Sequence, residues 1–328
     1  MQFFNYGNIV KFKNCVMLMV KFVLSIDGGG IRGVVVSEFL RHLEEHFCIR
    51  VYKHFDMFVG TSTGSLIAAG LGYCQFTGDE CSSIYNYEDA NTTMPQSWKN
   101  KIVGLSGLVP KYDGKGKTAN IKKYITKTKT EKDVVIPYYS LISRKPIIFK
   151  SWDNPLEQNI QDIIDMSSAA PAYFPAVMTD KDCGIDGSLF ANNPADIAYM
   201  EALSRYGLKE DIRILSISCG KSIVPTRNLN SYTKIGGFQW MLNGELLDLI
   251  IDCPQEVVNN KVDMACKIFK HKYTRVCGSI ENSSMDDVSE KNIERLKDIG
   301  LDWFLKYKDT INEFFRIQSI ESTTTATG

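Results

Sequence analysis

The sequence predicts an α/β protein with three layers, α/β/α, in which a mainly parallel central sheet lies between two layers of helices. From Lys21 onward, segments typical of strands are followed by glycine turns and then by helices, the order that produces a parallel sheet covered by helices. Two of these turns are rich in glycine or other small residues and directly follow strand-like segments. With 328 residues, 44% of them hydrophobic, the chain can bury a large core.

The first unit of this kind begins with an apolar strand predicted from Phe22 to Ile26. The segment from Val34 to Phe47 then carries apolar residues at helical spacing among charged ones, which predicts an amphipathic helix. The residues at that spacing are Val35, Phe39, Leu43 and Phe47.

The second unit begins with a strand predicted from Phe55 to Val59. It runs into a turn of small residues, Gly60 to Ser65, and then into a helix rich in small residues, Leu66 to Tyr73. This order predicts a strand, a tight turn and a buried helix.

The remaining chain is predicted from the same patterns. The segment from Tyr85 to Lys101 is polar and irregular, so we expect a surface excursion there. We further predict a strand pair at Val134 to Tyr138 and Ile147 to Phe149, and a helix at Asp162 to Ala170. A core strand is predicted at Ile212 to Ser218, and a mostly helical C-terminal region at Tyr232 to Gln318.

Charge and cysteine usage exclude several classes of function. Lys and Arg together number 38, as do Asp and Glu, so the chain gives no global electrostatic reason to expect nucleic acid as a partner. The nine cysteines are scattered, odd in number and never spaced as C-x-x-C, which argues against a zinc ribbon and against a disulfide scaffold. A reducing compartment, the cytoplasm, is the expected location.

An apolar run extends from Cys15 to Ile26 near the start of the chain. It is too short to span a bilayer, and Lys21 interrupts it, so we interpret its second half as the first buried strand. A membrane-touching or cleaved N-terminus is the alternative.

Lysine is concentrated between Lys111 and Lys132. The eight lysines of this segment have only Asp113 and Glu131 as acidic neighbours in the sequence. A solvated surface is the favoured interpretation, because charge runs usually are solvated. The alternative is a patch that holds the protein on anionic lipid.

A glycine motif, Asp27 to Gly33, lies between the first strand and the first helix, where free backbone N–H groups can face a negative charge. Gly28, Gly30 and Gly33 also fit G-x-G-x-x-G, so a dinucleotide-binding unit is an alternative. That unit requires an acidic residue at the end of the second strand. Here Asp56 lies at the beginning of that strand, which argues against a dinucleotide.

The turn Gly60-x-Ser62-x-Gly64 has the pattern of a nucleophile elbow, in which only small residues fit on either side of an exposed serine. The helix N-terminus after it favours negative charge, and the Thr63 N–H can point at the oxyanion of a tetrahedral intermediate. The alternative is a glycine turn with an incidental serine. The strand before and the helix after favour the elbow.

A Ser-His-Asp triad would need a histidine near this serine. The sequence suggests surface positions for His42, His46 and His271, and a position remote from Ser62 for His54. Asp186, in the turn Gly184 to Ser188, is then the best candidate for the base. An ordinary Asp-Gly turn is the alternative.

These residues resemble the patatin-like phospholipase family, whose marks are a D-G-G-G-x-R-G loop, a G-x-S-x-G elbow and a later D-G-[GA] turn leading to N-N-P. The first two are intact, and the third has Ser188 in place of glycine or alanine. Ser167 to Pro175 is similar to the family's S-A-A-P-x-Y-F-P stretch, whereas Ser65 stands where many members have glycine. The resemblance covers Lys21 to Gly220.

The resemblance implies a patatin-like fold and a lipid acyl hydrolase of phospholipase A type, with a lipid or phospholipid as substrate. It implies Ser62 as nucleophile and Asp186 as the base of a two-residue centre that works through an acyl-enzyme without metal or cofactor. It also implies an oxyanion hole, which with the elbow comprises Gly28, Gly29, Gly30, Arg32 and Thr63. The alternatives are a general carboxylesterase or lysophospholipase, or a lipid-binding protein without activity.

The expected organisation follows from these motifs. We expect an N-terminal extension at residues 1–20, a patatin-like catalytic core at 21–220, a helical C-terminal part of the same domain at 221–320, and a disordered tail at 321–328. The expected location is compatible with peripheral contact with membranes.

Overall fold

The structure is a computed structural model that describes residues 19–97, 109–223, 233, 236, 245–281 and 284–316. The expected N-terminal extension, apart from its last two residues, and the expected tail at 321–328 lie outside these ranges.

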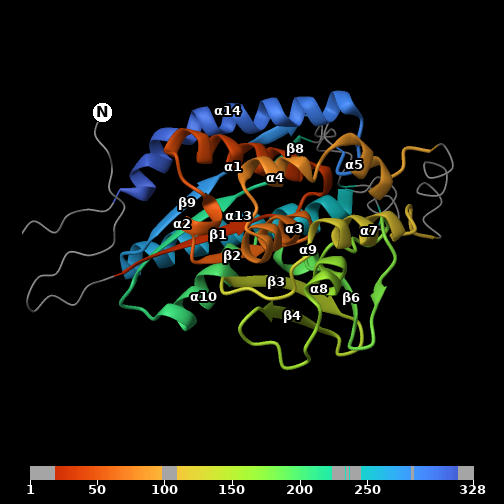
Figure 1. Cartoon of the computed structure of the whole chain (residues 1–328), viewed down its shortest axis with the longest axis horizontal. Helices are drawn as coiled ribbons and strands as arrows, with labels where there is room; N and C mark the ends of the chain where they lie inside the picture. The colour runs from red at the N-terminus through yellow and green to blue at the C-terminus, as the bar shows by residue number, and fades with distance from the viewer. Residues whose placement is uncertain are drawn as a thin grey trace, which may run out of the picture.

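The centre of the molecule is a mostly parallel sheet whose strands run in the order β5, β6, β3, β2, β1, β7, β9, with β4 paired to β3 (Figure 1). Strands β3, β2, β1, β7 and β9 pair in parallel, whereas β4, β5 and β6 join in antiparallel fashion. The strands are β1 (Val20–Ile26), β2 (Met57–Gly60), β3 (Asp133–Ser140), β4 (Lys145–Lys150), β5 (Val177–Met178), β6 (Cys183–Asp186), β7 (Asp211–Ile217) and β9 (Lys272–Val276). A separate parallel pair joins β8 (Lys221–Ile223) to β10 (Ser279–Glu281).

Helices cover both faces of this sheet. They are α1 (Gly33–Phe47), α2 (Val51–His54), α3 (Thr63–Ala69), α4 (Gly78–Ser83), α5 (Tyr87–Thr93), α7 (Lys115–Tyr124), α8 (Ile160–Ser167), α9 (Ser188–Ala191), α10 (Ala195–Tyr206), α13 (Glu245–Phe269) and α14 (Glu290–Phe315). A short 3-10 turn, η1 (Gly30–Arg32), precedes α1, and a π-helical turn, η2 (Gly70–Cys74), extends α3.

Strand β1 is buried on both faces, as expected for a central parallel strand. Phe22, Leu24 and Ile26 belong to one buried cluster together with residues of α1, α3, α8 and α14. Val23 belongs to a second cluster, together with residues of α10 and α13. This alternation separates two helical layers, and it confirms the predicted three-layer α/β arrangement.

The register around β3 brings β2 and β6, which are distant in sequence, end to end. Val135 of β3 pairs with Val59 of β2 on one side and with β4 on the other. Tyr138, further along β3, pairs with β4 and with Asp186 of β6. Since β4 lies on one side of β3 throughout, β2 and β6 share the other side. The end of β6 therefore meets the carboxyl end of β2.

One prediction about secondary structure was wrong. The segment expected to be an irregular surface excursion, residues 85–101, contains α5, which begins where the Asn86 side chain accepts the Asp89 N–H at 3.0 Å. The C-terminal region is mostly helical among its described residues, as expected, because α13 and α14 occupy most of it. It also contributes β9 to the central sheet and β10 to the separate pair, which were not predicted. Short strands beside long helices leave little periodic signal.

Candidate active site

Ser62 lies in the turn between β2 and α3, with φ 55° and ψ −122°, a backbone conformation that side chains other than glycine rarely adopt. Both flanking glycines are required by close packing. A Cβ on Gly60 would lie 2.1 Å from the Gly64 carbonyl oxygen, and one on Gly64 would lie 2.5 Å from the Ile26 carbonyl oxygen. These contacts give the turn the geometry of a nucleophile elbow.

Hydroxyl groups around Ser62 hold this strained turn. The Ser62 N–H donates to Ser167 Oγ at 3.2 Å, and Ser167 in turn donates to the Pro137 carbonyl oxygen at 2.7 Å. Ser65 donates to the Ser62 carbonyl oxygen at 2.6 Å. The departure at Ser65 thus adds a hydrogen bond to the elbow. Ser167 was not singled out by sequence reasoning, although it opens the stretch similar to S-A-A-P-x-Y-F-P.

Asp186 is the last residue of β6, so the end-to-end meeting of β6 and β2 carries it to the elbow. Its backbone N–H donates to the Ala169 carbonyl oxygen at 3.1 Å. The next residue, Gly187, packs so closely that a Cβ would lie 2.3 Å from the Pro137 carbonyl oxygen. Ser62 and Asp186 line the same pocket.

The Asp186 carboxyl is buried, with 1% of the residue exposed. Its Oδ1 accepts the Ser188 N–H at 2.7 Å, whereas its Oδ2 is buried without a hydrogen-bond partner among the described residues. Burial raises the pKa of this carboxyl, against the lowering effects of hydrogen bonding with Ser188 and Ser62 and of the charge on Lys117. The Ser62 hydroxyl is therefore close enough to the carboxyl to affect its pKa, although no well-aligned hydrogen bond to Oδ2 is formed among the described residues. Loose contacts of this kind are common in active sites without substrate.

The glycine loop borders the same pocket through Gly29, Gly30 and Ile31. In the part of the chain that the structure describes, no hydrogen bond uses the N–H of Gly29, Gly30 or Thr63. Gly30 has φ 59°, and a Cβ there would lie 2.2 Å from the Met285 carbonyl oxygen. These three backbone donors are available at the rim of the Ser62 site.

Two other residues expected in the oxyanion hole have different environments. The Gly28 N–H donates to the Asn192 carbonyl oxygen at 3.0 Å, so it is already used. Arg32 is buried, and its Nε donates to the Gly29 carbonyl oxygen at 3.3 Å. Arg32 therefore stabilises the glycine loop. Neither Gly28 nor Arg32 is among the described residues that line the pocket.

Asp27, the first residue of the glycine motif, is fully buried and faces Arg275 of β9. Arg275 donates to both carboxylate oxygens of Asp27, at 2.7 and 2.5 Å, and also to Ser216 Oγ at 2.7 Å. Burial raises the pKa of the Asp27 carboxyl in spite of this partner. The carboxylate thus anchors the end of β1 to the edge of the sheet.

The pocket has a volume of about 150 Å³ and is mostly apolar. Ser62 and Asp186 are among its polar lining residues. Its walls include the apolar side chains of Ile31, Leu66, Ile84, Ala90, Met94, Ile121, Ile164, Phe174, Leu189, Ile251 and Met285. A mostly apolar pocket with a few polar groups is suited to a ligand with a hydrocarbon chain and a polar linkage.

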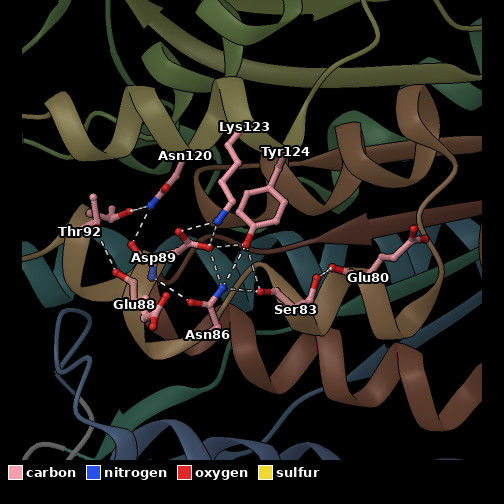
Figure 2. A network of polar contacts seen from close by, with 10 residues as sticks. Glu80, Ser83, Asn86, Glu88, Asp89, Thr92, Asn120, Lys123 and Tyr124 are labelled. Atoms are coloured by element: carbon pink, nitrogen blue, oxygen red, sulfur yellow. Dashed lines mark hydrogen bonds and ion pairs between the residues drawn. The ribbon is translucent and has the colours of Figure 1, made fainter.

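One wall of the pocket is formed by α5 and α7, and a polar network centred on Asp89 joins these helices (Figure 2). Lys123 donates to both Asp89 carboxylate oxygens, at 2.9 and 2.7 Å, and Tyr124 donates to the same group. Asn120 donates to the Asp89 carbonyl oxygen at 2.7 Å and to Thr93 Oγ1 at 2.8 Å. The network fixes the spacing between the two helices and hence this wall.

The lysine segment is not the uniformly solvated surface that the sequence suggested. Lys111, Lys117 and Lys123 bind acidic groups from distant elements, which are Asp286, Asp165 and Asp89 respectively. Sequence neighbours could not reveal these partners. The remaining exposed lysines are Lys115, Lys122, Lys127 and Lys129.

The prediction of a surface position for His271 was also wrong. Only 9% of this residue is exposed, and its Nδ1 is hydrogen-bonded with the Tyr199 hydroxyl at 2.9 Å. It precedes β9, at the opposite edge of the parallel strands from Ser62. The ring of His54 packs at a tilt against that of Phe22, at 5.1 Å between centroids, beside the beginning of β1. Neither lines the pocket as described.

Other features of the described residues bear on the class of site. Among them, no three His, Cys, Asp or Glu side chains gather as a group that could hold a metal ion. In the same ranges, no helix has both the length and the apolar character needed to cross a membrane.

Comparison with known proteins identifies the class. The chain belongs to the family described as patatin-like phospholipase, whose sequence profile matches residues 24–199. Patatin-like protein 2 of Oryza sativa subsp. indica is 30% identical over 336 residues, which cover 85% of this chain and 82% of the relative. Calcium-independent phospholipase A2-gamma of Rattus norvegicus is 25% identical over 329 residues, which cover 92% of this chain and 41% of the rat protein.

Comparison with solved structures also gives a match. VipD from Legionella pneumophila matches with a TM-score of 0.44 and 10% identity, covering 88% of this chain and 67% of that chain. The family membership confirms the resemblance that the three sequence motifs indicated.

Proposed function

We propose that this protein is a lipid acyl hydrolase of phospholipase A type that works through a dyad of Ser62 and Asp186. The observation that carries the proposal is the buried Oδ2 of Asp186, which has no hydrogen-bond partner among the described residues and lies in the same pocket as the strained Ser62. A buried polar atom without a partner is costly and is expected at a functional site. Membership of a phospholipase family supports a lipid ester as substrate.

In the first half of the reaction, Ser62 Oγ attacks the carbonyl carbon of the ester while its proton passes to Asp186 Oδ2. The carbonyl oxygen becomes an oxyanion, which accepts hydrogen bonds from the free N–H groups of Gly29, Gly30 and Thr63. When the tetrahedral intermediate collapses, the bond to the alcohol oxygen breaks and Asp186 returns its proton to that alcohol. The fatty acyl group remains esterified to Ser62.

In the second half, water gives a proton to Asp186 and attacks the acyl-enzyme. The new tetrahedral intermediate releases Ser62, which takes the proton back from Asp186, and the fatty acid leaves. The raised pKa of Asp186 suits both roles, because a free aspartate, with a pKa of about 3.9, is a weak base. The apolar pocket, which includes Ile121, Ile164 and Phe174, receives the acyl chain.

Two alternatives act at the same site. A general carboxylesterase or lysophospholipase would use the same chemistry with a smaller or single-chain substrate. A lipid-binding protein without activity would retain the fold and the pocket. The intact pair of Ser62 and Asp186 favours catalysis over binding alone.

The experiment that tests the proposal combines covalent labelling with a lipid panel. A serine-directed fluorophosphonate is expected to label Ser62 in the parent protein and to leave Ser62→Ala unlabelled. The parent is expected to release fatty acid from phospholipids, with activity unchanged in EDTA. Absence of labelling together with lipid binding would favour the inactive alternative, and loss of activity in EDTA that calcium restores would exclude the metal-free mechanism.

We also propose peripheral contact with lipid surfaces in a reducing compartment. Exposed lysines on and after α7 are available for this contact, and free thiols such as exposed Cys48 and Cys253 fit such a compartment. Reversing Lys122, Lys127 and Lys129 to Glu should weaken binding to anionic vesicles and spare hydrolysis of a soluble ester. Equal binding of variant and parent at low salt would exclude this contact.

A further inference from the structure

Lys117 is a lysine buried beside the proposed dyad. Only 6% of the residue is exposed, although it lies on α7 with the exposed Lys115 and Lys122. Its Nζ lies 2.7 Å from Asp165 Oδ1 and donates to the Asp165 carbonyl oxygen at 2.5 Å. It also donates to Ser168 Oγ at 3.2 Å.

Burial of this ammonium group is costly, because both members of a buried ion pair lose their hydration. Burial lowers the pKa of Lys117, and the charge of Asp165 opposes that effect. An apolar side chain of similar length would fill the space without this cost. The retention of a charge therefore suggests a role besides packing.

The contacts of Lys117 are concentrated at the end of α8, the helix that supports both dyad residues. Ser167, between the two residues that Lys117 binds, accepts the Ser62 N–H through its Oγ. Two residues later, the Ala169 carbonyl oxygen accepts the Asp186 N–H. A cation at a helix C-terminus also satisfies its last carbonyl groups. Lys117 thus holds the turn on which the position of Ser62 and Asp186 depends.

The charge of Lys117 also acts on Asp186 directly, since both residues line the pocket and the charge lowers the pKa of that carboxyl. The other charged groups nearby are committed elsewhere. Asp89, which also lines the pocket, pairs with Lys123. Asp182, directly before β6, accepts hydrogen bonds from Tyr138 and Ser140 of β3. Asp165 of α8 pairs with Lys117 itself, and Arg32 binds the glycine loop.

We propose that Lys117 is a positioning residue for the dyad: it fixes the end of α8 that holds Ser62 and Asp186, and its positive charge favours the ionised form of the Asp186 carboxyl. This inference rests on the proposed function. It predicts that removal of the charge will change the pH dependence of catalysis, an effect that a purely structural role would not produce.

The test compares Lys117→Met, which keeps the length of the stem and removes the charge, with Lys117→Arg, which keeps the charge. Lys115→Met, at an exposed position on the same helix, is the matched control. With a soluble short-chain ester, Lys117→Met should move the acid limb of the kcat profile up by about one pH unit, the lower end of the effect of a neighbouring opposite charge. Lys117→Arg should keep the acid limb near that of the parent, and Lys115→Met should leave the whole profile unchanged.

A second readout does not depend on activity. Carbon-13 NMR titration of the Asp186 carboxyl in the substrate-free protein should show a higher pKa in Lys117→Met than in the parent. If the single variant fails to fold, the double variant Lys117→Met, Asp165→Asn removes both buried charges and should show the same rise. An unchanged Asp186 pKa in a folded variant would overturn the inference, whereas a parent protein without Ser62-dependent hydrolysis would overturn only the proposed function.

Discussion

Asp27 and Arg275 form a buried two-pronged ion pair, with Arg275 Nη1 and Nη2 at 2.7 and 2.5 Å from the two carboxylate oxygens. The pair joins the end of β1, where the glycine loop begins, to β9 two strands away. The aspartate at the head of the D-G-G-G motif therefore fixes the loop within the sheet, and Gly29 and Gly30 after it line the pocket.

Replacement of Arg275 by Met should destabilise the protein strongly, because it leaves the Asp27 carboxylate buried without its partner. We expect a loss of about 3 to 5 kcal/mol in the free energy of unfolding, measured in urea. The double variant Asp27→Asn, Arg275→Met should recover much of this loss. As a control, Arg316→Met removes a solvent-exposed ion pair and should cost about 1 kcal/mol or less. An equal loss of unfolding free energy in Arg275→Met and Arg316→Met would contradict a stabilising role for the buried pair.

Replacement of Asp186 by Asn should stabilise the protein at neutral pH. The folded-state pKa of Asp186 is raised, so the folded chain binds this proton more tightly than the unfolded chain does. Stability is therefore greatest below the unfolded pKa and falls as pH rises through the folded pKa. The neutral amide removes this cost, and we expect a gain of about 0.5 to 2 kcal/mol. A parallel melt at acidic pH should show a smaller gain, and an equal gain at both pH values would contradict the linkage.

The Asp89 network should make the pocket wall sensitive to acid. Burial would raise the pKa of Asp89, but hydrogen bonds from Lys123, Tyr124 and Asn86 lower it. The stability that Asp89 contributes is therefore complete above its unfolded pKa, about 3.9, and is lost as pH falls through the lower folded value. Asp89→Asn should melt a few degrees lower than the parent at pH 7, with the difference narrowing in strong acid. Glu88→Gln, an exposed change on the same helix, should leave the melting temperature unchanged.

The apolar pocket should set the length of acyl chain accepted. Ala90→Leu on α5 adds volume to the pocket wall and should lower kcat/KM for long-chain esters about tenfold relative to short-chain ones. Ala119→Leu makes the same change at an exposed position on α7 and should keep the parental profile. If Ala90→Leu kept the parental dependence on chain length, the acyl chain would not bind against this part of the pocket.

The sequence allowed accurate prediction wherever local sterics dictate structure. Glycines at 60 and 64 are required by contacts within a few residues of the elbow or with the end of β1, so the pattern itself carried the information. The strands at Phe22 to Ile26 and Ile212 to Ser218 were predicted because both are buried on two faces and hence rich in apolar residues.

Features that depend on distant partners could not be predicted in this way. Asp186 was proposed from an Asp-Gly turn. It lies beside the elbow because β6 and β2 pair with successive parts of the same side of β3. Lys117 looked like one of eight solvated lysines, and only the tertiary fold reveals Asp165 beside it. His271 looked exposed for the same reason, since Tyr199 is distant in sequence.

The most direct test of the dyad is fatty-acid release from phospholipid vesicles by the parent, Ser62→Ala, Asp186→Asn, the double variant and His271→Ala. We expect each dyad variant to lose activity by at least about 1,000-fold with its fold intact, the double variant to lose little more, and His271→Ala to remain active. Near-parental turnover in Asp186→Asn together with an inactive, folded His271→Ala would contradict the dyad and indicate a histidine-based centre.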